Sequence, residues 1–204
     1  MTDEKFTYPA IAAVIFCLTF PAYWFWFASS GFDLPGYGKQ WRSNLGLDYF
    51  TWLALGIMAL YIYFSLVSVL SKLHNYTRLT IPLYLQMGAT VLMCGGTGIL
   101  EFLLVIFGAA LSDTANQLLI NGIALIFVCS IVIQGVVDIV IGAVLLRDAK
   151  ELPNILTIFA IITLISGLLG ATVIFAIGTV LTIPMSFAVL AIYFLNRPEV
   201  IDVV

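Results

Sequence analysis

The amino-acid sequence predicts an all-α, polytopic integral membrane protein, built as a bundle of six transmembrane helices with short loops. Of its 204 residues, 62% are hydrophobic and only 9% are charged, whereas soluble domains carry about 25% charged residues. The hydrophobic residues gather in runs of about 20 or more, which is the length an α-helix needs to cross the hydrocarbon core of a bilayer. One domain covering residues 1–204 accounts for the whole pattern.

Six apolar segments are long enough to be transmembrane helices. We expect them at approximately 8–28, 49–69, 81–111, 118–146, 155–175 and 179–195. The last two form one uncharged stretch of about 41 residues, which as a single helix would reach about 60 Å, twice the hydrocarbon thickness. The chain must therefore fold back, and Gly178–Thr179 is the expected turn because glycine tolerates the backbone angles that a turn requires.

The first segment is expected to be a retained helix and not a cleaved signal peptide. It is about 20 residues long and rich in aromatic residues, unlike the short apolar core of a signal sequence. Pro21 should kink it by removing a backbone hydrogen bond. The aromatic residues that follow either form a belt at the membrane interface or line a pocket for a lipid tail, a quinone or another flat apolar ligand. The candidates for such a pocket are Tyr23, Trp24 and Trp26.

The distribution of basic residues predicts the orientation. Six of them fall on one side of a six-span arrangement, namely Lys5, Lys72, Arg78, Arg147, Lys150 and Arg197. Cytoplasmic loops are enriched in Lys and Arg, so both termini are expected in the cytoplasm of a multi-pass protein of the cell membrane, most simply a bacterial inner membrane. The connection 31–48 then faces outward. Its candidate contacts with lipid headgroups or a partner protein are Asp33, Lys39, Trp41 and Arg42.

Polar side chains recur at helical spacing in the third and fourth segments. They are Gln86, Thr90, Cys94, Thr97 and Glu101 in the third segment, and Ser130, Gln134 and Asp138 in the fourth. Steps of three or four residues place side chains on one face of a helix. The connection 112–117 is short, so the two helices should be antiparallel neighbours whose polar faces meet.

These two faces support two interpretations. In the first, they form a ladder from Glu101 to Asp138 that carries a proton or a small cation, since carboxylates inside membranes often mark ion pathways. The two acids should then lie about 15 Å apart along the membrane normal, because they differ by about ten residues in distance from the turn. In the second, the polar side chains only hold helices together, each hydrogen bond contributing about 0.6 kcal/mol.

The glycines beside this face fit either interpretation. Gly95, Gly96 and Gly98, with Gly135 and Gly142 on the following helix, allow close packing of backbones. A break in the third helix at these glycines, as in the discontinuous helices of some transporters, is the less favoured alternative because no proline accompanies them.

Several kinds of chemistry lack the residues they need. The three cysteines, Cys17, Cys94 and Cys129, lie within apolar segments and are expected to be free thiols. A single histidine, His74, gives no basis for a His or Cys metal site, and no cofactor is expected. Basic residues are too scattered for a nucleic-acid surface. With the only histidine in a loop, no catalytic arrangement is indicated, although enzymatic activity stays open.

The favoured hypothesis is therefore a non-enzymatic membrane protein that serves as an accessory, assembly or sensory partner of another membrane protein. Its expected partners are membrane lipids, together with another membrane protein or further copies of itself. The alternative is a small proton- or cation-coupled transporter or channel subunit that uses the ladder from Glu101 to Asp138.

Overall fold

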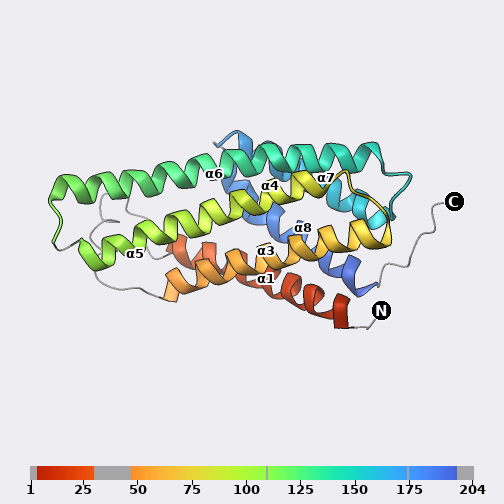
Figure 1. Cartoon of the computed structure of the whole chain (residues 1–204), viewed down its shortest axis with the longest axis horizontal. Helices are drawn as coiled ribbons and strands as arrows, with labels where there is room; N and C mark the ends of the chain where they lie inside the picture. The colour runs from red at the N-terminus through yellow and green to blue at the C-terminus, as the bar shows by residue number, and fades with distance from the viewer. Residues whose placement is uncertain (1–3, 30–46, 109, 174, 197–204) are drawn as a thin grey trace.

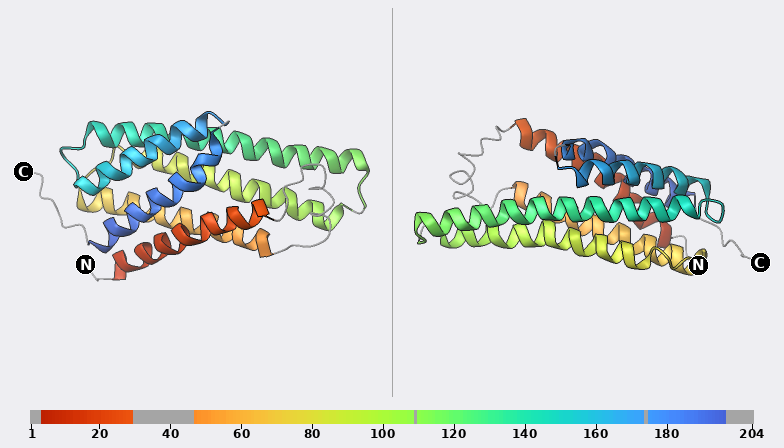
Figure 2. Two further views of the ribbon diagram at one scale, coloured as in Figure 1. Left: turned by 180° about the vertical axis from the view of Figure 1, so that it is seen from behind. Right: turned by 90° about the horizontal axis from the view of Figure 1, so that it is seen from above.

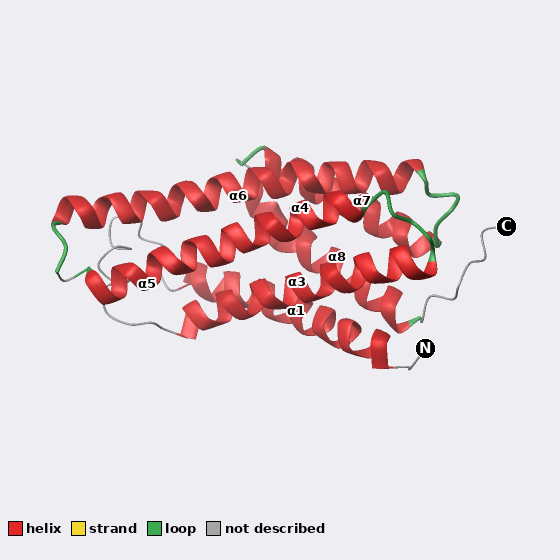
Figure 3. Ribbon diagram, viewed as in Figure 1, coloured by secondary structure: helices red, strands yellow, loops and turns green. Residues whose placement is uncertain are grey.

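The computed structural model describes residues 4–29, 47–108, 110–173 and 175–196. Every regular element in these residues is helical, and six helices are long and apolar enough to cross a membrane. They lie side by side along the length of the bundle, and none of the described residues forms a strand (Figures 1 and 3). The predicted fold class is confirmed.

The first, second, fourth and fifth spans are single helices: α1 (Glu4–Ser29), α3 (Leu47–Leu73), α6 (Asp113–Arg147) and α7 (Asn154–Ala171). The third span joins α4 (Thr80–Thr90), the π-helical turn η1 (Val91–Gly96) and α5 (Thr97–Phe107). The sixth consists of a 3-10 turn, η2 (Ala176–Gly178), and α8 (Thr179–Leu195). The predicted spans overlap all six.

The turn between the last two spans differs from the prediction. α7 ends at Ala171, so the chain reverses over the residues that follow, and Gly178 has a helical φ of −64°. The unusual backbone angle belongs to Val173, whose φ is 53°. That left-handed conformation costs a non-glycine residue about 1–2 kcal/mol. The prediction of a turn at Gly178–Thr179 was wrong because the left-handed residue is a valine, which sequence patterns for turns do not select.

The beginning of α1 and the end of α8 lie at the same end of the bundle, together with the α3–α4 and α6–α7 connections (Figures 1 and 2). Four basic residues lie at or beside these two connections: Lys72, Arg78, Arg147 and Lys150. At the opposite end the α5–α6 hairpin extends past α7 and α8 (Figure 1). The cytoplasmic orientation of this end, which rests on the distribution of basic residues, stays a prediction.

The closest helix contact is between α6 and α7, where glycines of the two helices meet. A Cβ atom added to Gly135 would lie 2.3 Å from the backbone nitrogen of Ala171, and one added to Gly167 would lie 2.6 Å from the carbonyl oxygen of Gly135. No room exists for a side chain at either position. Small residues therefore bring the two backbones into direct contact, which is a common way for helices to associate in membranes.

Candidate functional site

The third span turns its polar face toward the interior of the bundle. Gln86, Thr90, Cys94 and Thr97 are all buried, whereas Glu101 is half-buried. The backbone stays helical through η1, so the alternative of a broken helix at the glycines is wrong. In an α-helix, residues four positions apart are separated by slightly more than one full turn, so a face that repeats every four residues gradually rotates around the helix axis. A π-helical turn contains more residues than an α-helical turn, so η1 offsets part of this rotation.

The polar face of α6 meets that of the third span. α6 packs against α4, η1 and α5, and its Ser130 and Asp138 are buried. Five of the eight residues of the predicted ladder line one partly open cavity of about 50 Å³, namely Gln86, Thr90, Cys94, Gln134 and Asp138. A water molecule needs about 10–15 Å³ by this measure, so the cavity has room for several waters.

A second cavity, of about 40 Å³, adjoins the first. Both cavities are lined by Phe20, Trp52, Met93, Gln134, Asp138 and Ile183. The second also has Trp24 and Phe127 in its wall. The ring centroids of Trp24, Trp52 and Phe127 lie 6.2 to 6.3 Å from one another. One carboxylate, Asp138, therefore borders both cavities, and aromatic side chains line both of them.

The predicted aromatic pocket is placed only in part. Trp24 lines the second cavity, and Tyr23 stacks on Trp52 at a centroid distance of 5.6 Å. Trp26 is 51% exposed and lines neither cavity, which suits a position facing lipid. Trp52 and Phe127 come from α3 and α6, and no sequence pattern linked them to the aromatic residues of the first span.

Asp138 is only 8% exposed. Among the described residues, no Lys, Arg or His lines either cavity. The ion pairs that these residues form involve Asp148 and not Asp138. Tyr63, in the wall of the first cavity, lies beside both Asp138 and Gln86. A carboxylate inside a membrane protein without a basic neighbour is suited to hold a proton or a cation.

Other oxygens face the same space. The Gln86 Oε1 atom is buried and accepts no hydrogen bond from the described residues. The Thr90 hydroxyl donates its proton to the backbone oxygen of Gln86, leaving its oxygen lone pairs as acceptors. The first cavity thus presents hydrogen-bond acceptors from α4 and a carboxylate from α6.

The remaining ladder residues lie outside the cavity wall. The Thr97 hydroxyl donates to the backbone oxygen of Met93 and accepts a 3.4 Å hydrogen bond from the Trp52 indole. Ser130 is fully buried, and Glu101 lies further along α5. The path from Asp138 to Glu101, and the 15 Å separation of the two acids, stay predictions. Asp33, Lys39, Trp41 and Arg42 lie outside the described residues.

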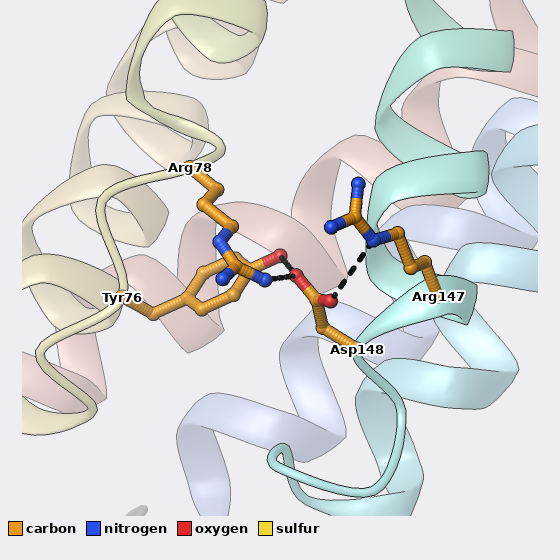
Figure 4. Close-up of polar contacts among 4 residues, drawn as sticks. All are labelled: Tyr76, Arg78, Arg147 and Asp148. Carbon is orange, nitrogen blue, oxygen red and sulfur yellow. Dashed lines mark hydrogen bonds and ion pairs between the residues drawn. The ribbon is translucent and has the colours of Figure 1, made fainter.

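A polar cluster joins the α3–α4 connection to the start of the α6–α7 connection (Figure 4). Asp148 is 6% exposed and accepts hydrogen bonds from the Tyr76 hydroxyl at 2.8 Å and the Arg78 guanidinium at 2.7 Å, and Arg147 lies 3.7 Å away. His74 is also buried, and its Nε2 lies 2.8 Å from the Tyr193 hydroxyl of α8. The sequence had suggested no role for these basic residues beyond orientation, because their partners lie far along the chain.

Acidification is expected to loosen this end in two stages. Burial lowers the pKa of His74, so below about 6.5 the unfolded chain takes up a proton before the folded one does. The Arg78 guanidinium and the Tyr76 hydroxyl hold the pKa of Asp148 below its usual range. A second loss of folding stability therefore begins below about pH 3.9, the ordinary pKa of an aspartate. In both cases the unfolded state binds more protons, and stability falls as the pH falls.

Thermal unfolding of the purified protein between pH 8 and pH 5 measures the first stage. The wild-type Tm should fall over this range, and His74→Gln should flatten the decline because glutamine does not titrate. An equally steep decline in the variant would contradict a contribution from His74.

The helices and the cavities together define the class of this protein: a multi-pass α-helical membrane protein in which a buried carboxyl group, Asp138, borders two small, partly open cavities. Its sequence matches no protein-family model, and searches of curated proteins and of solved structures find no significant similarity. An argument for function therefore starts from the cavities themselves.

Proposed function

We propose that this chain is a small proton- or cation-coupled transporter, or a subunit of a channel, in which Asp138 is the ion-binding residue. The observation that carries the proposal is the position of Asp138, which is buried, has no basic partner among the described residues and borders two cavities. Placing an ionisable group in a membrane interior is costly, and such residues characteristically serve ion or proton pathways.

The surroundings of Asp138 suit a site that both binds and releases an ion. Gln86, Gln134 and Thr90 supply neutral oxygens around the carboxylate, and waters in a cavity of this size would connect them. The Thr97 hydroxyl donates its proton to the backbone, so we place the continuation toward Glu101 in water beside Cys94. In this proposal Asp138 is the first ion-binding residue of the pathway, and Glu101 is a second, more distant one.

Proton or cation flux into proteoliposomes tests this proposal. Asp138→Asn should reduce flux to the rate of empty liposomes, because the amide neither takes up a proton nor balances a cation. Glu101→Gln should also reduce it if the ladder extends that far. Glu151→Gln makes the same chemical change at an exposed residue beyond α6 and should leave flux unchanged. Normal flux through a correctly inserted Asp138→Asn protein would contradict the proposal.

An accessory, assembly or sensory role is the second candidate function, and the α5–α6 hairpin favours it. This hairpin extends past α7 and α8 (Figure 1). It exposes a series of large apolar side chains: Ile99, Phe102, Ile106, Leu118 and Leu125. Purification in a mild detergent followed by mass spectrometry separates the two candidates, since a stoichiometric partner protein supports the accessory role.

A further inference from the structure

The walls of the two cavities suggest a more specific ligand than a bare proton. We infer that they bind a small primary alkylammonium ion, with methylammonium as the simplest example, and that Asp138 is its counter-ion. This inference rests on the proposed function, because it assigns a substrate class to the same site. Three properties of the walls carry it: their charge, their hydrogen-bonding groups and their aromatic rings.

The charge of the site favours a monovalent cation. An ionised carboxylate removed from water is strongly unfavourable, so a buried carboxyl group either holds a proton or is accompanied by an opposite charge. Among the described residues, the walls hold one carboxylate, Asp138, and no basic side chain. One positive charge neutralises the site, whereas a divalent ion would normally recruit more than one carboxylate.

The hydrogen-bonding groups of the first cavity match the donors of an ammonium group. A primary ammonium has three N–H donors and no acceptor, as in the lysine side chain. The first cavity offers it the Asp138 carboxylate, the Gln86 Oε1 and the Thr90 hydroxyl oxygen. Gln86 is 3% exposed and its Oε1 lacks a donor among the described residues. A quaternary ammonium, which has no N–H, would leave this acceptor unsatisfied.

The second cavity suits the carbon end of such a ligand. Trp24 and Phe127 line the second cavity alone and Trp52 lines both, and aromatic rings attract both apolar groups and nearby cations. Asp138 and Gln134 border both cavities, so a nitrogen held in the first can direct its methyl group into the second. Cavities of about 50 and 40 Å³ each hold a few water-sized atoms, so a ligand as small as methylammonium fits with space left for water.

Equilibrium binding of radiolabelled methylammonium to the purified full chain tests this inference. Wild type should bind it saturably, and Asp138→Asn should weaken binding at least about tenfold, since a charge-assisted hydrogen bond is lost. Asp138→Glu should retain binding because it keeps the charge. Phe127→Leu should weaken it by about three- to fivefold, as expected for the loss of one aromatic ring beside a cation.

Matched controls make the loss specific. Phe102→Leu repeats the aromatic change on an exposed residue of α5, and Glu151→Gln repeats the charge change outside the bundle. Both should bind methylammonium as wild type does. Unlabelled tetramethylammonium should compete poorly, whereas unlabelled methylammonium should compete fully. Each variant is compared only after its Tm and its size-exclusion profile show a folded protein.

The outcomes separate this inference from the proposed function. If Asp138-dependent proton or Na⁺ flux is present but methylammonium neither binds nor competes with it, the inference is wrong and the proposed function stands. If Asp138-dependent flux and methylammonium binding are both absent, both are wrong. Saturable binding that is unchanged in Asp138→Asn would also overturn the inference, because the ligand would then lie elsewhere.

Discussion

Replacing Gly135 with leucine is expected to prevent α6 and α7 from packing together, and so to abolish the folded protein or lower its Tm by more than ten degrees. A Cβ atom at this position would lie 2.3 Å from the Ala171 nitrogen and 2.8 Å from the Gly170 carbonyl carbon. Both are backbone atoms, which cannot rotate away as the end of a side chain can. Even one added methylene in a packed core costs about 1–3 kcal/mol, and leucine adds four carbon atoms beside a fixed backbone.

Gly88→Leu is the matched control, because an added Cβ there meets nothing within 4 Å. The two substitutions add the same side chain and the same helix propensity to a helix. Thermal unfolding followed by size-exclusion chromatography should show loss of the monodisperse protein only for Gly135→Leu. Equal Tm values for the two variants would show that α6 and α7 do not contact each other as described.

Asp138→Asn is expected to raise the Tm at pH 8 while it removes ion binding. Asparagine keeps the shape of aspartate, but it does not need the hydration that the buried carboxylate has lost. Replacing buried charged groups by neutral ones of similar volume is often neutral or stabilising. In a domain of about 200 residues, each kcal/mol gained raises the Tm by about 2–4 °C.

Asp148→Asn is expected to lower the Tm, in contrast to Asp138→Asn. Asp148 accepts hydrogen bonds from Tyr76 and Arg78, so the same substitution there should lower the Tm. Measuring both variants under one condition removes general effects of the aspartate-to-asparagine change. A lower Tm for Asp138→Asn would indicate that Asp138 is a packing residue, which is the second interpretation of the polar faces.

Sequence reasoning placed the helices and part of the site because both depend on periodicity along a short stretch. Gln86, Thr90 and Cys94 share one helical face, and the short 112–117 connection makes α6 their neighbour. The meeting of these residues with Gln134 and Asp138 at one cavity follows from those two facts. Helix geometry and short connections are local properties, and a single sequence displays them directly.

The rest depended on contacts between residues far apart in the chain. Trp52 and Phe127 reach the aromatic cavity from α3 and α6, and Tyr76 reaches Asp148 across 72 positions. No spacing rule connects such pairs. The turn at Val173 was missed because apolar residues surround it and a nearby glycine offered a more usual turn. The orientation, the outer connection and the role of Glu101 stay predictions.

The unequal lengths of the helices have a consequence for how the protein sits in the membrane. α6 has 35 residues and α7 has 18, which correspond to about 52 Å and about 27 Å. The hydrocarbon core is about 30 Å thick, and even a tilt of 40° leaves α6 spanning about 40 Å. The ends of α6, which carry polar residues such as Asp113, Gln117 and Arg147, can therefore project beyond the hydrocarbon core. The α5–α6 hairpin would then stand above the membrane surface on the side where α7 ends and α8 begins, and its end would be reached from the aqueous phase.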